Sequence, residues 1–287
     1  MDQKYIDLFD RYTHGQMKRR EFLDRLSRLA GGTAAAAALL PGLENNYALA
    51  EMVAETDTRI LPETIEYDSS VGKLKGYLVK QKQFAKAPGV VVIHENRGLN
   101  PHIKDVTRRF ATEGFLALGP DYLTPQGGTP DDADKARDMI GLLKPEDAVA
   151  ISRASVAELA KRPDCTGKVA AVGFCWGGGQ VNQLAVAEPA LDAGVAYYGR
   201  QPKGEQVPAI KAPLLLHYAG LDEGINAGIE AYQKALTDNG KVFELYIYEG
   251  VNHAFNNDTN AARYNKEAAE LAWSRTIEFL KKNLATA

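Results

Sequence analysis

The stretch that decides the fold is Val169-Ala170-Ala171-Val172-Gly173-Phe174-Cys175-Trp176-Gly177-Gly178-Gly179. Its apolar half is typical of a strand buried on both faces of a sheet, and it leads directly into a glycine-rich turn. The turn reads Gly-x-Cys-x-Gly, which is the nucleophile-elbow pattern Gly-x-Ser-x-Gly with sulfur in place of the serine oxygen. Glycines are needed two positions before and after Cys175 because strand and helix crowd together there. The stretch predicts a cysteine exposed on a sharp turn, beside the first amides of a helix. Taken alone, it also fits a buried structural cysteine.

Two polar residues further along the chain favour catalysis. Apolar runs at residues 214–218 and 245–248 end just before Asp222 and His253, respectively. Ligands of open α/β sheets bind beyond the carboxyl ends of the strands, and nucleophile, acid, histidine is the chain order of α/β-hydrolases. The order predicts a triad in which Asp222 orients the imidazole and His253 takes the proton of the Cys175 thiol.

The loop that follows an earlier apolar strand, His94-Glu95-Asn96-Arg97-Gly98, stands where this fold supplies one amide of the oxyanion hole. We expect the backbone N–H groups of Asn96 and Trp176 to form that hole.

A zinc site of the pattern His-Glu-x-x-His is excluded because Gly98 stands at the position of its second histidine. The remaining histidines, His14, His102 and His217, are not expected to form a ligand cluster, and His217 is expected in the core. No metal site is predicted.

Strands and helices alternate around these motifs. Strands are predicted at residues 64–68, 73–80, 89–94, 115–118, 168–173, 193–198, 213–218 and 242–248. Helical patterns fall at residues 103–113, 145–161, 177–187, 225–238 and 261–283. The first two strands form an antiparallel hairpin, and the alternation that follows indicates crossover units and a parallel sheet. We expect one doubly wound α/β domain over residues 51–287, with helices on both faces of the sheet.

Residues 1–50 differ from this body. They contain an amphipathic helix at residues 2–12, the run Lys18-Arg19-Arg20-Glu21-Phe22-Leu23, and an Ala-rich apolar run that Pro41-Gly42 is expected to break. With the small residues Ala48-Leu49-Ala50, these features resemble a twin-arginine export signal. That interpretation predicts cleavage near Glu51 and a periplasmic location. The alternative is a retained helical arm, packed on the body or on a partner subunit, in a cytoplasmic protein.

The composition of the chain excludes fewer classes of protein than its motifs do. The chain has 287 residues, of which 45% are hydrophobic and 25% charged, as in ordinary globular proteins. Its net charge of −3 gives no electrostatic reason to expect a nucleic-acid partner. No apolar run reaches the roughly 20 residues that span a bilayer. Two cysteines cannot form a disulfide framework. A homodimer is left open.

From about residue 64 to residue 284 the chain resembles the dienelactone hydrolase family, the cysteine-dependent branch of the α/β-hydrolases. The resemblance is carried by Glu95, Pro120-Asp121, the Gly-x-Cys-x-Gly-Gly run, Tyr197-Tyr198-Gly199, Asp222 and His253. It implies hydrolysis of a small ester or lactone through an acyl-enzyme on Cys175, without a metal or organic cofactor. It also implies that Glu95 touches the resting thiol. A carboxylate there would keep the thiol protonated, and so protected from oxidation, until substrate arrives.

The resemblance does not extend to the residues that bind the substrate. The founding enzymes of the family hold a substrate carboxylate with two arginines. This chain has neither arginine, and Asn257 stands at one of the two positions. We therefore take Arg97, Tyr122, Tyr198 and Arg200 as candidate substrate-binding residues. Two other functions stay open: a broad carboxylesterase or thioesterase, and a non-catalytic protein that binds small molecules.

Overall fold

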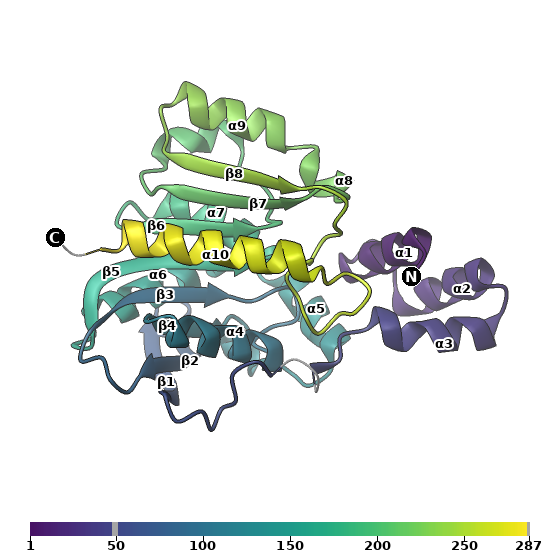
Figure 1. The fold of residues 1–287 in the computed structure, drawn as a ribbon, viewed down its shortest axis with the longest axis horizontal. Coiled ribbons are helices and arrows are strands. Elements are labelled where there is room, and N and C mark those ends of the chain that lie inside the picture. The colour runs from purple at the N-terminus through teal and green to yellow at the C-terminus, as the bar shows by residue number, and fades with distance from the viewer. Residues whose placement is uncertain (48–50, 286–287) are drawn as a thin grey trace.

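The computed structural model describes residues 1–47 and 51–285. At its centre lies an eight-stranded sheet in the order β1-β2-β4-β3-β5-β6-β7-β8 (Figure 1). The strands are β1 (Ile60–Ser69), β2 (Gly72–Gln81), β3 (Ala87–Ile93), β4 (Leu116–Asp121), β5 (Cys165–Phe174), β6 (Ala193–Tyr197), β7 (Leu214–Ala219) and β8 (Phe243–Tyr248). Strand β2 is antiparallel to both of its neighbours, and the other neighbouring pairs are parallel. The predicted doubly wound α/β fold is confirmed.

The helices are α1 (Gln3–Thr13), α2 (Arg19–Ala30), α3 (Thr33–Leu43), α4 (Pro101–Thr112), α5 (Ala133–Leu142), α6 (Pro145–Lys161), α7 (Trp176–Ala187), α8 (Glu223–Asn226), α9 (Ile229–Asp238) and α10 (Lys266–Asn283). Two short 3₁₀ helices, η2 (Thr124–Gln126) and η3 (Gly204–Ala209), lie in the connections. Among the described residues, no helix has both the length and the apolar character that crossing a bilayer requires.

In the body, the helices differ from the prediction at three places. The expected helix at residues 225–238 is divided into α8 and α9. The expected helix at residues 261–283 begins only at Lys266, because the side chain of Asn265 caps it by accepting from the amide of Ala268 at 3.0 Å. Helix α5 was not predicted, although Asp132 caps it in the same way.

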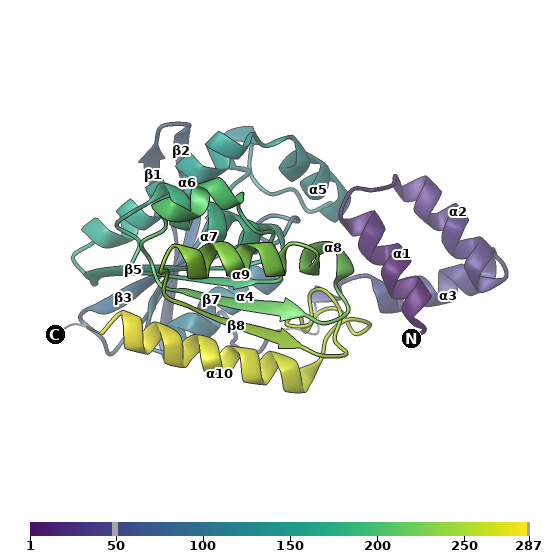
Figure 2. The ribbon, with the colours of Figure 1, turned by 90° about the horizontal axis from the view of Figure 1, so that it is seen from above.

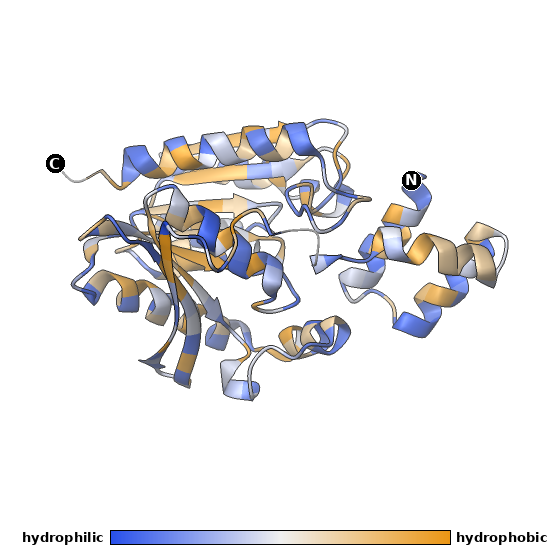
Figure 3. Cartoon of the chain, turned by 60° about the horizontal axis from the view of Figure 1, so that its bottom comes forward, coloured by the Kyte–Doolittle hydropathy of each residue, from blue (hydrophilic) through white to orange (hydrophobic). Residues whose placement is uncertain are grey.

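Helices cover both faces of the sheet. On one face α4 and α10 pack on Val90, Val92 and neighbouring side chains. On the other face α5, α6, α7 and α9 pack on Val91, Ile93 and their neighbours. The strands between the two helical layers are among the most hydrophobic parts of the chain (Figure 3). Because both faces of the sheet are buried, polar side chains that bind a ligand are expected in the loops at the carboxyl ends of the strands.

Residues 1–47 form a three-helix arm at the end of the molecule toward which β7 and β8 point (Figures 1 and 2). The arm has its own apolar cluster, which includes Phe9, Tyr12, Phe22 and Leu26. The apolar run does not end at Pro41 as expected: α3 continues to Leu43, whose fully buried side chain belongs to this cluster. The predicted cleavage motif at residues 48–50 lies outside the described residues.

Body side chains hold the arm in place. Arg19, one of the paired arginines, lies 2.8 Å from Asp134, whose carboxylate also accepts from the hydroxyl of Tyr12. Arg263 lies 3.2 Å from Asp10, and Asn96 donates to the carbonyl of Thr13 at 2.6 Å. These contacts come from three separate body segments and attach α1 to the carboxyl end of the sheet.

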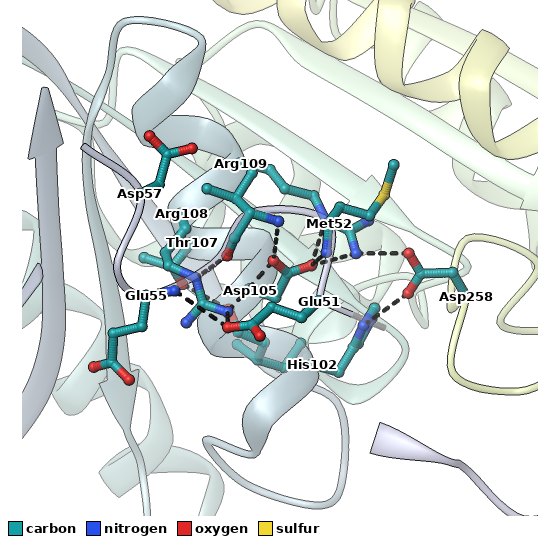
Figure 4. Close-up of polar contacts among 12 residues, drawn as sticks. Glu51, Met52, Glu55, Asp57, His102, Asp105, Thr107, Arg108, Arg109 and Asp258 are labelled. Atoms are coloured by element: carbon teal, nitrogen blue, oxygen red, sulfur yellow. Dashed lines mark hydrogen bonds and ion pairs between the residues drawn. The ribbon is translucent and has the colours of Figure 1, made fainter. Parts of the chain in front are cut away.

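A buried ion cluster anchors the segment that follows the arm (Figure 4). Asp105 on α4 is 1% exposed. Its carboxylate accepts from the amide of Val53 at 2.9 Å and from Arg109 at 2.7 Å, and Arg108 lies 3.4 Å away. Arg109 also reaches Asp258, in the loop before α10, at 2.6 Å. The cluster therefore links the chain entering β1 to the loop that carries His253.

Candidate active site

Cys175 lies on a strained turn between β5 and α7. Its φ of 56° and ψ of −117° are outside the regions that non-glycine residues favour. A Cβ on Gly173 would lie 2.1 Å from the carbonyl oxygen of Gly177, and one on Gly177 would lie 2.4 Å from that of Ile93. The close approach of these backbones explains why the turn requires glycine on both sides of the cysteine.

The order of the strands places this turn beside the loop that carries Asn96. Strands β4 and β5 lie on opposite sides of β3, so the chain leaves β3 in one direction and β5 in the other. A crevice forms at such a switch point, where open α/β sheets bind ligands. The loops after β3 and β5 therefore line one site.

Asp222 and His253 meet as the sequence predicts. The Nδ1 atom of His253 lies 2.5 Å from the Asp222 carboxylate, and both side chains are buried. The Nε2 atom of His253 is buried without a hydrogen-bond partner in the described residues, and a ring nitrogen of His253 lies within 4.8 Å of the Cys175 sulfur. A ring held by a carboxylate on one side, with its second nitrogen free, has the geometry of a base that serves the cysteine.

A second histidine, His14, also reaches the sulfur. Its Nε2 atom lies 3.6 Å from the Sγ of Cys175, and its ring centroid lies 4.6 Å from that of His253. Sequence reasoning did not place His14 at this site; α1 brings it to the other side of the thiol. His217 is a core histidine as expected, and burial lowers its pKa to about 3.

The charged groups around Cys175 favour the thiolate form of its side chain. Burial works against the ionised sulfur, but the positive charge of His253 and the hydrogen bond from His14 lower the pKa of Cys175 to about 6. Burial likewise disfavours the imidazolium of His253, yet the charges of Cys175 and Asp222 raise its pKa well above the usual value. Both shifts act in the same direction, toward a thiolate paired with an imidazolium.

The expected oxyanion-hole residues lie in this crevice. Both Asn96 and Trp176 line the cavity that Cys175 and His253 also line. Trp176 is the first residue of α7, and the first amides of a helix have no partner within it. The Trp176 ring stacks on His94, with centroids 5.5 Å apart.

Glu95 and Arg97 are buried beneath the arm. The carboxylate of Glu95 accepts from Asn257 at 2.8 Å. Both residues border a small cavity that also touches Cys175 and His253. The hydrogen bond that the structure records for the sulfur is the one to His14. A contact between Glu95 and the thiol therefore stays a prediction.

A cavity of about 700 Å³ opens over the sulfur. Arg200 and Tyr198 line it, as does Gly15 of the arm. The Tyr198 ring lies 4.8 Å from that of His253. Tyr122 is fully buried behind Trp176, with its hydroxyl 2.7 Å from that of Ser152, and is not among the lining residues. Of the four candidate substrate-binding residues, Tyr198 and Arg200 face this cavity.

Sequence reasoning missed the pair Asp10 and His14. Their spacing of four residues places them on the same face of a helix, which is a visible pattern. The spacing does not reveal where that face docks, because the contacts of α1 come from residues far along the chain.

Comparisons with known proteins agree with the fold. The sequence profile of the Dienelactone hydrolase family matches residues 74–284, and a second profile, described as YqhI-like, matches residues 1–32. A protein of Saccharolobus solfataricus named "Putative carboxymethylenebutenolidase" is 33% identical over 258 residues, which cover 77% of this chain and 99% of that protein.

Two further similarities concern a fragment and a solved structure. The Escherichia coli K12 protein named "Putative hydrolase fragment YghX" is 51% identical over 107 residues, covering 36% of this chain and 92% of its own. The crystal structure titled "Putative Dienelactone Hydrolase" from Klebsiella pneumoniae has a TM-score of 0.70 and 26% identity, covering 78% of this chain and 99% of that one.

Proposed function

The chain belongs to the dienelactone hydrolase family, and on this premise we propose that it hydrolyses a small ester or lactone through an acyl-enzyme on Cys175. The observation that carries the proposal is the arrangement of Asp222, His253 and Cys175 at the carboxyl ends of β7, β8 and β5. A hydrolase acting on esters or lactones is what family membership implies.

In the proposed reaction the Cys175 thiolate attacks the carbonyl carbon, and the oxyanion faces the amides of Asn96 and Trp176. The carbon–oxygen bond to the leaving group breaks, and His253 gives its proton to the departing alkoxide. Neutral His253 then takes a proton from water, which attacks the acyl carbon. The carboxylic acid leaves, and the thiolate is regenerated. Asp222 keeps the imidazole in one tautomer throughout.

The cavity supports a substrate with an apolar part and a polar part. Ile140, Leu142 and Ile225 contribute apolar surface, while Arg200 and Gln180 contribute polar groups. Its volume falls within the usual range of small-molecule sites. We propose Arg200, exposed at the rim, as the contact for a substrate carboxylate.

For the amino-terminal residues we propose a retained arm, the alternative to an export signal. The contacts of Arg19 with Asp134 and Glu44, and the burial of Phe22, support this proposal, because the residues of the paired-arginine motif are used in packing.

The proposal is tested by replacing the nucleophile. Cys175→Ala should abolish turnover of p-nitrophenyl acetate while the thermal unfolding midpoint changes little, since the change is small and lies on a turn. Cys165→Ala, at the protein's other cysteine, is the matched control and should keep its activity. Turnover near the wild-type rate in Cys175→Ala would exclude the triad, and activity on a panel of esters, lactones and thioesters would separate the esterase and thioesterase alternatives.

A further inference from the structure

The arm carries a second histidine–carboxylate pair to the sulfur. The Nδ1 atom of His14 lies 2.8 Å from the carbonyl oxygen of Asp10 and 3.3 Å from its carboxylate. The Nε2 atom of His14 points to Cys175. Asp222 and His253 form a similar pair: Nδ1 of His253 lies on the Asp222 carboxylate, and a ring nitrogen of His253 lies within 4.8 Å of the sulfur. The cysteine thus lies between two similar pairs, one from the body and one from the arm.

We propose that His14 is an active-site residue that, as an imidazolium, holds Cys175 as a thiolate and leaves His253 to transfer protons. The inference rests on the proposed role of Cys175 as the nucleophile. His14 keeps its proton throughout turnover, so the proton balance of the reaction is unchanged. Its charge favours the thiolate twice: before attack, and when the sulfur leaves the acyl carbon, because a thiol of lower pKa is a better leaving group.

The surroundings of His14 favour its charged form. It caps the carboxyl end of α1, where the helix dipole stabilises a cation. Burial disfavours the imidazolium, but the hydrogen bonds with Asp10 and Cys175 raise the pKa of His14 to about 10. The pKa of the Asp10 carboxyl is held far below its usual value: the charges of His253 and Arg263 and the hydrogen bond to His14 outweigh burial.

Other charged and titratable groups face the same cluster from each element around it. They are Asp10 from α1, Glu95 and Arg97 from the loop after β3, Arg137 and Asp138 from α5, Tyr198 and Arg200 after β6, Asp222 after β7, and His253 and Arg263 from the segment between β8 and α10. The carboxylates of Asp10 and Asp222 are each paired with a histidine, and His14 contacts the sulfur directly.

The body fixes His14 from both sides. Asn96 holds the carbonyl of Thr13, the residue before it, and Arg263 holds Asp10. Arg137 of α5 packs over the Tyr12 ring, with its guanidinium 4.7 Å from the centroid. Thr13 and Gly15 also line the large cavity, so the arm forms part of its wall. These contacts with the body fix the position of His14 in the folded protein.

The test is the pH dependence of Cys175 alkylation in the full-length protein. Iodoacetamide is added in buffers containing EDTA, and modification of each cysteine is followed by peptide mass spectrometry, with buried Cys165 as the internal reference. In the wild type the rate should rise through a pH of about 6. In His14→Gln the midpoint should rise by about one pH unit or more, since an opposite charge at this distance has been removed.

Three variants make the test specific. Asp10→Asn keeps the imidazole of His14 but removes the carboxylate that pairs with it. The midpoint of Cys175 alkylation should therefore rise in this variant too, but by less than in His14→Gln. Arg20→Gln, an exposed change in α2, is the matched control and should leave the profile unchanged. A midpoint that moves from about 6 to about 7 in His14→Gln halves the thiolate population at pH 7 and lowers it about tenfold at pH 5, so kcat/KM should fall about twofold at pH 7 and about tenfold at pH 5. Thermal unfolding with one midpoint, close to that of the wild type, checks that the arm stays docked.

Two results would overturn the inference. Alkylation profiles of wild type and His14→Gln that superimpose would mean that His14 does not stabilise the thiolate. A higher kcat/KM in His14→Gln would mean that the arm blocks the site. Failure of the proposed function looks different: Cys175→Ala would keep its turnover, while the alkylation midpoint of the wild type would still respond to His14.

Discussion

At the scale of single residues, backbone strain marks the site. Among the described residues, three non-glycine residues have positive φ: Cys175, Tyr198 and Ala254. Cys175 follows β5, Tyr198 follows β6, and Ala254 follows His253 in the loop after β8. Strained residues persist where the surrounding structure determines their conformation, and they gather at functional sites. The sequence predicts the first of them, because glycines surround it, but nothing local indicates the other two.

Glu95 provides a prediction at this scale. If its carboxylate acts on the thiol, Glu95→Gln should lower the midpoint of Cys175 alkylation by about one pH unit, because a repelling charge is removed. The variant should also be inactivated faster by peroxide, since thiolates oxidise more readily. Glu249→Gln, an exposed carboxylate in the loop before His253, is the matched control. Superimposable profiles for Glu95→Gln and wild type would leave Glu95 with its Asn257 contact alone.

At the scale of elements, the strands were easier to predict than the helices. The buried runs of β3 and β5 are apolar, and β7 is interrupted only by His217. The predicted hairpin is present, although β1 begins four residues before its predicted start at residue 64. The helices depend more on caps and on tertiary contacts. The last turn of α3 passes through Pro41 because Leu43 is buried in the arm, and that packing outweighs the loss of one backbone hydrogen bond.

The ion cluster around Asp105 gives a prediction for these connections. Asp105→Ala should lower the free energy of unfolding by about 3–5 kcal/mol, because Arg108 and Arg109 would lose a buried carboxylate partner. Urea denaturation measures the change. Glu66→Ala removes an exposed carboxylate that pairs with Lys75, and it should change the midpoint little. A loss in Asp105→Ala no larger than that in Glu66→Ala would contradict the structural role of the cluster.

At the scale of the whole molecule, sequence reasoning predicted the mostly parallel sheet but not the position of the arm. The sheet follows from the alternation of strands and helices, while the triad, predicted from three residues at strand ends, stays a proposal. The arm docks through pairs such as Arg263 with Asp10 and Asn260 with the carbonyl of Leu43, which join distant parts of the chain. No local pattern encodes such pairs.

Retention of the arm predicts the mass of the native protein. Protein purified from its own host should have an intact mass that includes His14, because we propose that the arm belongs to the working enzyme. Periplasmic and cytoplasmic fractions are measured separately. A chain beginning near Glu51 in the active fraction would favour the export signal and would remove His14 from the mechanism.

The docking site of the arm also sets the order in which the enzyme becomes complete. The arm leaves the ribosome first, but part of the surface that receives it, from Asn252 to Arg263, is among the last to be made. Until those residues emerge, a new chain can hold its arm only through earlier partners such as Asn96 and Asp134. The contacts that Arg263 makes with Asp10 and Asn260 makes with Leu43 therefore form only when synthesis is nearly finished.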